Sequence, residues 1–527
     1  MVISAISKLS RSGQVARFRS LVANFRLNKR GNVAVISAFA VLPMIAAVGC
    51  AIDYSTASMI KTKLQAAADA ASLATVSVNS AVVTTAKSMS SSGTVSGGST
   101  FASNYFNANL TTSPEDVGYS NLTPTATVTV SGTTMTAVVS FTAQVPTTFM
   151  GIMGYHNITV SGTSTASYSL PSYINFYMML DVSGSMSFPS TTNEQTRLQA
   201  VNPDNNTLYP NGCTFACHFT ASGACPESEQ GPTGSSNNPA VGSATNPSPG
   251  GYCQGFIISR LGTTLSTGGK VNWTNPQVSS CSAAGTTSCI QLRADAVGYA
   301  VTQLLSYASS NELVPNQYQV GLYPFIQNLY TDFALTTNLT GAISTAAQNL
   351  ASLLDTGANA SLGSGGTHFE NAFSSMNSLI TTVGTGFSSS SPLPYVFIIT
   401  DGSQNYQTQW NGNWSSQNWS ATSAVPYNNS ATVIPPNTVT STDYCTTMKK
   451  RGITIAVLYI PYETIQNATT FANSEDIYAN NNIPNIPPAL QTCASPNFFY
   501  TASTPTAINN ALIAMFNQAV STAHLSN

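Results

Sequence analysis

The stretch that decides the fold is Ile174-Asn175-Phe176-Tyr177-Met178-Met179-Leu180-Asp181-Val182-Ser183-Gly184-Ser185. It begins as an almost continuous apolar run and ends in an acid, followed by two serines around a glycine. An apolar run of this kind predicts a strand that is covered on both faces, as in a parallel sheet. The polar residues after it would then lie at the carboxyl edge of the sheet, where doubly wound folds bind their ligands.

The same kind of strand recurs further along the chain, with helical patterns between. Besides 174–180, we predict buried strands at 318–324, 395–400 and 453–460. We predict helices at 291–308, 342–354, 369–381 and 507–522. Strands that alternate with helices indicate an α/β fold with a parallel, doubly wound, Rossmann-like sheet.

Oxygen-bearing side chains gather at the predicted carboxyl edge. The sequence Thr400-Asp401-Gly402 ends a second buried strand, and Gly365-Gly366-Thr367 lies in a glycine-rich loop that opens a helix. Two carboxylates and three hydroxyls are hard donors that suit Mg²⁺, with Ca²⁺ or Mn²⁺ as alternatives. The predicted metal ligands are Asp181, Ser183, Ser185, Thr367 and Asp401. His368 is interpreted as a loop histidine with local hydrogen bonds rather than as an added ligand.

This combination resembles the metal-ion-dependent adhesion site of von Willebrand factor A domains: D-x-S-x-S after one strand, a separate threonine, and an aspartate after a later strand. The resemblance covers about residues 173–520. It implies that Ser183, Ser185 and Thr367 contact the cation directly, while Asp181 and Asp401 hold it largely through water. It also implies that a carboxylate from a protein partner completes the coordination.

The N-terminal part of the chain has the pattern of a membrane anchor. Of 17 basic residues, seven lie within the first 30 positions, and no acid precedes Asp53. Residues 33–52 are almost entirely apolar, and about twenty such residues cross the ~30 Å hydrocarbon core of a bilayer. Since basic flanks stay in the cytoplasm, we predict a single-pass protein of the bacterial inner membrane with a cytoplasmic N-terminus. Its C-terminal domain would be periplasmic or at the cell surface. A cleaved signal peptide is the alternative.

Composition limits the class of protein. Charged residues make up 7% of the 527 residues, against roughly 25% in ordinary soluble domains. Residues 31–527 carry 10 basic and 19 acidic side chains, a net charge of −9. Nucleic-acid binding needs clustered cations, so we expect no nucleic-acid partner.

A second resemblance lies in the same N-terminal region. The sequences Arg30-Gly31-Asn32-Val33, Ala51-Ile52-Asp53-Tyr54 and Leu64-Gln65-Ala66-Ala67-Ala68-Asp69-Ala70-Ala71 look like the TadE/TadG-like N-terminal segment of tight-adherence (Flp) pilus assembly proteins. It implies pilus-assembly components as partners. Pilin-type processing after Gly31 is not expected, because Ile36 occupies the position where a glutamate would be required.

The predicted organisation has five parts. They are a cytoplasmic basic segment at 1–30, a transmembrane helix at 31–52, an alanine-rich juxtamembrane helix at 53–80, a small Ser/Thr-rich β module at 81–172 and a von Willebrand A domain at 173–527 with long inserts at 188–288 and 402–440. Within the β module, 147–153 is expected to form a short helical connection.

Cysteine content agrees with export. One cysteine, Cys50, lies in the apolar run, and eight lie beyond it: Cys213, Cys217, Cys225, Cys253, Cys281, Cys289, Cys445 and Cys493. An even number on the exported side indicates disulfides, whose pairing the sequence leaves open. A zinc cluster at Cys213, Cys217, His218 and Cys225 is the alternative.

These features favour a non-enzymatic, membrane-anchored protein that binds a protein partner through a divalent cation, in Flp/Tad pilus assembly or adhesion. A structural cell-surface protein or a matrix adhesin unrelated to pili is the alternative. A hydrolase is disfavoured because neither Ser183 nor Ser185 lies in a G-x-S-x-G motif, and the sequence has no P-loop or dinucleotide fingerprint.

Overall fold

The computed structural model describes residues 30–110, 118–201, 265–266, 270–271, 280–287, 289–354, 361–363, 367–403, 407–410, 413–416, 444–462, 464 and 483–525. The chain divides into two compact units, Met1–Ser169 (unit 1) and Leu170–Asn527 (unit 2). Most of both predicted inserts, 188–288 and 402–440, lies outside the described residues.

Unit 1 is built on one long helix, α2 (Arg30–Thr75). The predicted transmembrane and juxtamembrane helices are therefore continuous, and they end at Thr75 instead of reaching residue 80. Along the first half, large apolar side chains are exposed, with Phe39 at 74%. The second half buries small residues such as Ala67, Ala68 and Ala71, which let the neighbouring sheet approach the helix closely. Of the described helices, α2 alone is long and apolar enough to cross a membrane.

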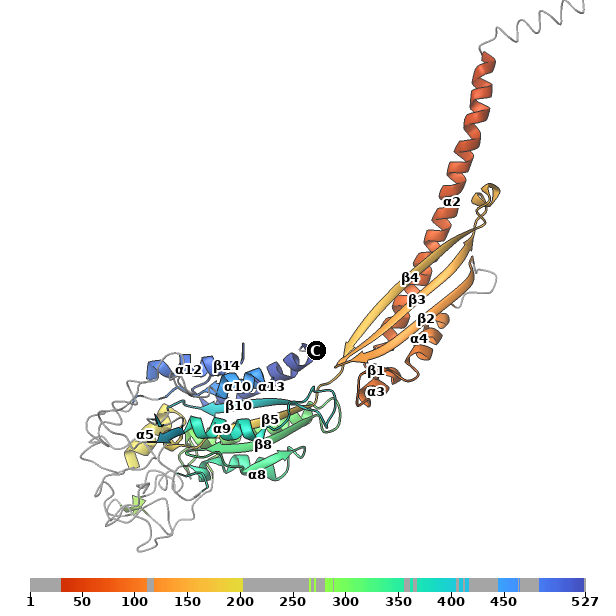
Figure 1. The fold of residues 1–527 in the computed structure, drawn as a ribbon. Helices are drawn as coiled ribbons and strands as arrows, with labels where there is room; N and C mark the ends of the chain where they lie inside the picture. Colours follow the sequence, from red (N-terminus) through yellow and green to blue (C-terminus); the bar gives the residue numbers. More distant parts are fainter. Residues whose placement is uncertain are drawn as a thin grey trace, which may run out of the picture. The chain divides into compact units, whose positions relative to one another are not determined.

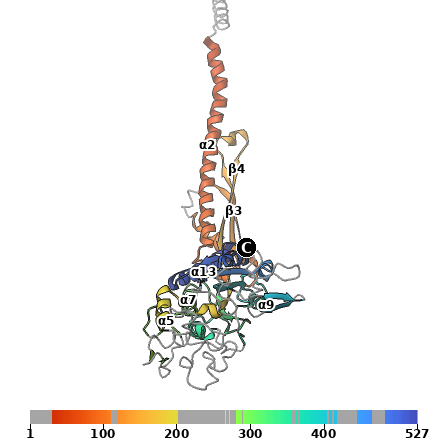
Figure 2. The ribbon, with the colours of Figure 1, turned by 90° about the vertical axis from the view of Figure 1, so that its left-hand side faces the viewer.

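A four-stranded antiparallel sheet lies along α2 in both views of the ribbon (Figures 1 and 2). Its strands follow in the order β1 (Gly93–Thr94), β2 (Ser120–Ser131), β3 (Thr134–Pro146) and β4 (Asn157–Ser169). In β3 every second residue, from Met135 to Val145, is buried, while threonine and serine occupy most of the outward positions. The short helix η2 (Met150–Met153) connects β3 to β4, within the predicted 147–153.

The predicted β module needs a correction at its start. Two helices, α3 (Ala81–Lys87) and α4 (Gly98–Ala108), precede the three long strands. Ser80 caps α3 by accepting a hydrogen bond from the Val82 amide. In α4, Ala102 and Phe106 are four residues apart and both buried, which places them on one helix face. Frequent serine and threonine obscured these short apolar faces in the sequence.

Unit 2 contains the predicted doubly wound sheet, which confirms the α/β fold class. The strand order is β14-β13-β10-β5-β8-β9, and each neighbouring pair is parallel except β8 and β9. The strands are β5 (Ile174–Asp181), β8 (Tyr318–Phe325), β9 (Phe333–Thr336), β10 (Leu393–Thr400), β13 (Thr454–Tyr459) and β14 (Phe499–Thr501). The chain runs outward from β5 to one edge, then crosses to β10 and runs to the other. The switch in direction therefore lies between β5 and β10.

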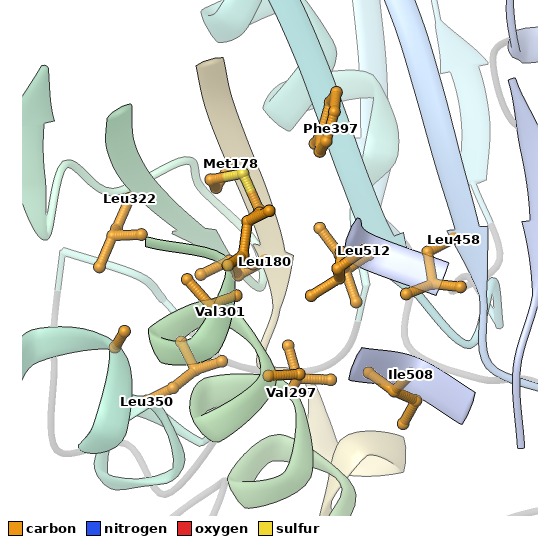
Figure 3. Packing of buried hydrophobic residues seen from close by; sticks show 14 of the residues in the cluster. Met178, Leu180, Val297, Val301, Leu322, Leu350, Phe397, Leu458, Ile508 and Leu512 are labelled. Atoms are coloured by element: carbon orange, nitrogen blue, oxygen red, sulfur yellow. The ribbon is translucent and has the colours of Figure 1, made fainter. Parts of the chain in front are cut away.

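Helices cover both faces of this sheet. One face carries α7 (Arg293–Ser310), α8 (Ala342–Gln348), η5 (Leu350–Leu353) and α13 (Pro505–Leu525). The other carries α9 (Phe369–Leu379), α10 (Tyr444–Lys450) and α12 (Ile486–Cys493). Alternate residues of β5 enter opposite cores: Met178 and Leu180 pack with Val297, Val301 and Leu512 (Figure 3), and Met179 joins the second core.

Smaller elements complete unit 2. They are η3 (Gly184–Ser187), α5 (Thr192–Val201), β6 (Leu265–Ser266), β7 (Lys270–Val271), β11 (Gln407–Trp410), β12 (Asn413–Ser416) and η7 (Ile483–Asn485). The antiparallel pair β11 and β12 brings Trp410 and Trp414 into one hairpin of the second insert.

Two disulfides confirm that the exported cysteines pair. Cys281 is bonded to Cys289, and Cys445 in α10 is bonded to Cys493 at the end of α12. Among the described residues, Cys50 is the free cysteine. The other four, Cys213, Cys217, Cys225 and Cys253, lie outside the described residues, so the alternative of a zinc cluster is not tested.

We expect Gly298→Ala to lower the stability of unit 2. Alanine would normally stabilise a helix interior by about 0.5–1 kcal/mol. A Cβ at Gly298 would, however, lie 2.2 Å from the carbonyl oxygen of Ala347 in α8, and overpacking costs about 1–3 kcal/mol. Thermal unfolding should show a lower Tm, while Gln303→Ala on the exposed face of α7 serves as control. A Tm above that of the parent would contradict the close packing of α7 on α8.

Candidate metal centre at the carboxyl edge of the sheet

The site begins with Asp181, the last residue of β5, whose side chain is fully buried. One carboxylate oxygen accepts the Ser183 amide at 2.9 Å, and the other accepts the Thr400 hydroxyl at 2.5 Å. The Thr400 oxygen in turn accepts the Gly402 amide at 2.8 Å. Because Thr400 ends β10, these bonds connect the ends of β5 and β10 at the switch point of the sheet.

Two serine hydroxyls lie next to this carboxylate. Ser183 directly precedes η3 and is buried, whereas Ser185 lies within η3 and is partly exposed. Their Oγ atoms are 3.2 Å apart. The sharp turn of η3 thus presents two hydroxyl oxygens together, with Ser185 on the side that solvent can reach.

Asp401 is the second buried carboxylate of the site. Its Oδ1 accepts the Ser403 amide at 3.2 Å, but its buried Oδ2 has no hydrogen-bond donor. The nearest cation is Arg293 at the start of α7, whose Nη1 lies 3.7 Å from Oδ2. Arg293 also donates to the Pro461 carbonyl at 2.9 Å, and its guanidinium lies over the Phe188 ring.

The electrostatics of the two acids favour an added positive charge. Burial raises the pKa of Asp181 to about 7, the charge of Asp401 raises it further, and hydrogen bonds from Thr400 and Ser183 oppose the shift. Burial also raises the pKa of Asp401, while Arg293 and a hydrogen bond from Ser185 oppose it. One arginine therefore compensates two buried carboxylates only in part.

Thr367 lies at the same edge, beyond β8. The amide of the next residue, His368, donates to the carbonyl of Ile326 at 2.9 Å, and Ile326 follows the end of β8, where Phe325 pairs with Asp181. Thr367 is buried. His368 makes local backbone hydrogen bonds at the start of α9. The structure thus places the five predicted ligands at one edge and joins four of them by printed contacts or shared partners.

The donor set fits a hard cation. Within the described part of the chain, no group of three or more His, Cys, Asp or Glu side chains is placed to hold a metal. At this edge the donors are instead carboxylate and hydroxyl oxygens, which suit Mg²⁺, Ca²⁺ or Mn²⁺. The buried Asp401 oxygen without a donor is the atom that a cation or its water would satisfy.

Two residues of this site escaped the sequence analysis. Arg293 contacts Asp401 across 108 positions of sequence, so no local pattern could indicate the pair. A signal was present nonetheless, because a lone arginine at the start of an apolar helix in a cation-poor chain calls for an acidic partner. Thr400 was noted only as part of the Thr400-Asp401-Gly402 turn, although its hydroxyl is the contact between the two central strands.

The first insert is closed at its base beside the site. The Arg293 amide donates to the Phe188 carbonyl at 2.8 Å, and the Ser190 amide donates to the Gln291 carbonyl at 2.8 Å. The Ser190 hydroxyl adds a bond to the Gln291 side chain at 2.7 Å. The chain therefore leaves and re-enters unit 2 at one point, which keeps α7 in register with the end of β5.

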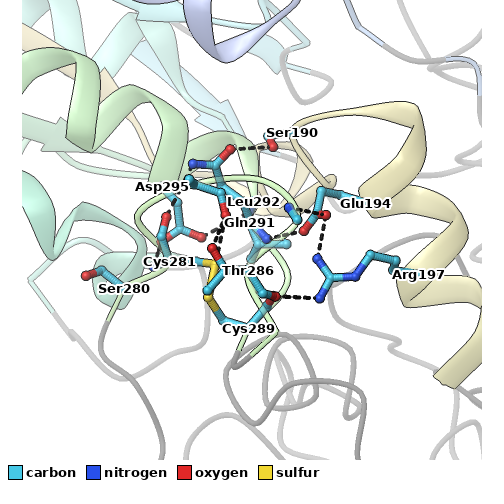
Figure 4. Close-up of a disulfide and its surroundings, with 12 residues drawn as sticks. Ser190, Glu194, Arg197, Ser280, Cys281, Thr286, Cys289, Gln291, Leu292 and Asp295 are labelled. Atoms are coloured by element: carbon cyan, nitrogen blue, oxygen red, sulfur yellow. Dashed lines mark hydrogen bonds and ion pairs between the residues drawn. A yellow bond between two sulfur atoms is a disulfide. The ribbon is translucent and has the colours of Figure 1, made fainter.

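A buried ion pair fastens the disulfide loop to this base (Figure 4). Glu194 of α5 accepts the amides of Gly285 and Gln291 at 2.9 and 2.7 Å and pairs with Arg197 at 2.6 Å. Arg197 also donates to the carbonyl of Cys289 at 3.0 Å. On the other side, Asp295 of α7 accepts the Cys281 amide at 3.1 Å. Both cysteines of the loop are thereby bonded to helices of unit 2.

We expect Arg293→Met to make stability depend on divalent cations. Removing one partner of a buried ion pair costs about 3–5 kcal/mol, so without metal the Tm should fall. Added Mg²⁺ should recover part of that loss, because it compensates the exposed charge of Asp401. Arg197→Met breaks the Glu194 pair instead and should lose stability with no such recovery. Equal Mg²⁺ responses in the two variants and the parent would contradict the proposed role of Arg293.

Three comparisons with known proteins bear on this chain. Residues 31–78 match the Tad family, described as Flp pilus-assembly TadE/G-like. No curated protein matches the sequence.

Among solved structures, the pilus adhesin SpaC from Lactobacillus rhamnosus GG is similar with a TM-score of 0.30 and 12% identity, over 78% of this chain and 35% of SpaC. The von Willebrand domain of the type V pili tip protein Mfa5 from Porphyromonas gingivalis gives 0.29 and 10%, over 67% of this chain and 97% of that domain. BatB from Bacteroides thetaiotaomicron gives 0.23 and 14%, over 43% and 89%.

The present chain thus spans about a third of the length of SpaC. TM-scores this low carry no argument about function. The fold rests instead on the strand order of unit 2, and the family on the N-terminal match. Residues 31–78 form a TadE/G-like Flp pilus-assembly domain, and the chain joins this domain to an α/β unit of von Willebrand factor A type.

Proposed function

We propose that unit 2 binds an acidic protein partner through a divalent cation held by Asp181, Ser183, Ser185, Thr367 and Asp401. The observation that carries this proposal is the burial of two carboxylates at the switch point of the sheet, one of them with an oxygen that has no hydrogen-bond donor. Burying a charge is costly unless it is paired. A resident cation supplies that pairing.

Charge balance explains why the partner should be acidic. The two carboxylates and Arg293 sum to −1, so a bound Mg²⁺ brings the site to +1. A carboxylate that approaches this cation gains a strong charge-assisted interaction. The partly exposed Ser185 marks the side from which such a ligand would enter, since Asp181 and Asp401 are buried beneath it.

The role is non-enzymatic in this proposal. The two serine hydroxyls face each other at 3.2 Å, and Asp181 and Asp401 lie beside them. Oxygens clustered in this way are suited to ligating a cation, whereas a nucleophilic serine needs a base that removes its proton.

The N-terminal domain suggests where binding takes place. With the TadE/G-like segment at 31–78 and the basic residues before it, we propose that α2 crosses the bacterial inner membrane with the N-terminus in the cytoplasm. Unit 2 would then act outside the cytoplasm in Flp pilus assembly or adhesion. A matrix adhesin unrelated to pili is the second candidate.

Metal binding can be measured directly on the full chain in detergent, with Mn²⁺ as probe and electron paramagnetic resonance of the free ion as readout. Asp181→Asn should weaken Mn²⁺ binding at least about tenfold, equivalent to about 1.4 kcal/mol, because it removes a charge from the site. Asp332→Asn, on the connection between β8 and β9, is the matched control. Unchanged Mn²⁺ affinity in Asp181→Asn would refute the site.

Partner binding should depend on the same cation. Protein captured from bacterial membranes by the full chain in Mg²⁺ should be lost in chelator and with Ser185→Ala, but retained with Asp332→Asn, because the partner's carboxylate needs the ion. Mass spectrometry of the captured protein then separates pilus components from matrix ligands. Capture that survives chelator would show that binding does not use the metal.

A further inference from the structure

The connection between β3 and β4, residues 147–156, is fastened to α2 and is called the hairpin tip. The carboxylate of Asp53 in α2 accepts the backbone amides of Thr148, Phe149 and Met150 at 3.0, 2.9 and 2.7 Å. Asp53 is buried. These three bonds satisfy both its charge and the free amides at the start of η2, so the tip is held at one place along the helix.

A second contact fixes the same level. A Cβ at Gly49 would lie 2.5 Å from the Cβ of Phe149, so the tip can approach α2 only because residue 49 is glycine. Gly49 and Asp53 are one helical turn apart, about 6 Å along the axis. The apolar run of α2 ends between them and just beyond, at Ile52. The tip therefore lies where the apolar run gives way to the polar part of the chain.

The outward side of the tip is apolar. Ile152 is 86% exposed, Tyr155 is 65% exposed and Met153 is 49% exposed. The segment 147–157 contains no Asp, Glu, Lys or Arg. At the same level, α2 exposes Val48, Ile52 and Tyr54, so the apolar surface of the tip continues that of the helix.

We propose that the hairpin tip is a second membrane contact that inserts Ile152, Met153 and Tyr155 into the interfacial layer of the bilayer from which α2 emerges. The inference rests on the membrane-spanning role of α2 in the proposed function. Tyrosines accumulate at this depth because their rings are apolar and their hydroxyls can reach water. Asp53 tolerates the position because three amides already bind its carboxylate.

Lipid suits this surface because of its position. The exposed side chains are continuous with those of the apolar helix, and a flat layer at the level of residues 49–53 would meet both at once. A tip seated in the interface would limit the rotation and tilt of α2, which a single helix leaves to its neighbours and to interfacial anchors. A protein that covers the tip is the competing occupant, and depth measurements distinguish the two.

The test is a depth measurement on the full chain reconstituted in phosphatidylcholine vesicles, in a Cys50→Ala background. A nitroxide label is placed at Ile152→Cys, with Leu42→Cys in the apolar run and Val78→Cys beyond the end of α2 as references; both references are well exposed in the structure. The unsubstituted Cys50→Ala chain provides the labelling blank. Power saturation compares accessibility to oxygen, which enters the bilayer, with accessibility to a polar nickel complex, which stays in water.

We expect the oxygen-to-nickel ratio at 152 to shift from the value at 78 toward the value at 42. Adding Asp53→Ala, which releases the tip, should return the ratio at 152 toward that at 78. A ratio at 152 equal to that at 78, with 42 in the bilayer, would overturn the inference and leave the anchor intact. Low accessibility of 152 to both reagents would also overturn it, in favour of a protein partner. A ratio at 42 equal to that at 78 would overturn the anchor itself.

Discussion

Two carboxylates buried side by side at the switch point are the constraint on which the rest of unit 2 depends. The fold brings the ends of β5 and β10 together, so Asp181 and Asp401 cannot avoid each other. The neighbouring groups are arranged to compensate for them. Thr400 donates across the two strands, the turn after β5 donates an amide, and α7 begins with an arginine beneath Asp401. These groups compensate the charge only in part, and a cation-binding edge follows from that deficit.

The low charge content of the chain has a physical counterpart in its interior. Beyond residue 30 the sequence has only 29 charged side chains, and six of them are buried: Asp53, Asp181, Glu194, Arg293, Asp295 and Asp401. Charged residues are rarely buried unless paired. Here each contacts backbone amides or carbonyls or an opposite charge. Charge in this protein therefore fixes specific junctions, while serine, threonine and asparagine supply most of the solubility.

Sequence patterns predicted those parts of the fold in which local chemistry reports burial. β5, β8, β10 and β13 were found because each is covered on both faces and reads as an unbroken apolar run. The edge strands β9 and β14 are short, and β9 is exposed or half-buried, so they carry no such run. The five candidate ligands follow strand ends and loop glycines, which are local signals. Arg293 and the tie between Asp53 and the hairpin tip join residues about a hundred positions apart, and only the folded chain reveals them.

The closed base of the first insert separates its evolution from that of the site. Because Phe188 to Ser190 and Gln291 to Arg293 are hydrogen-bonded to each other, what lies between them is a loop with fixed ends. Doubling the length of such a loop costs only about 0.6 kcal/mol. Selection can therefore lengthen, shorten or replace this segment without moving η3 or α7. The protein can diversify what surrounds its metal edge while the edge itself stays constant, much as an antibody framework carries variable loops.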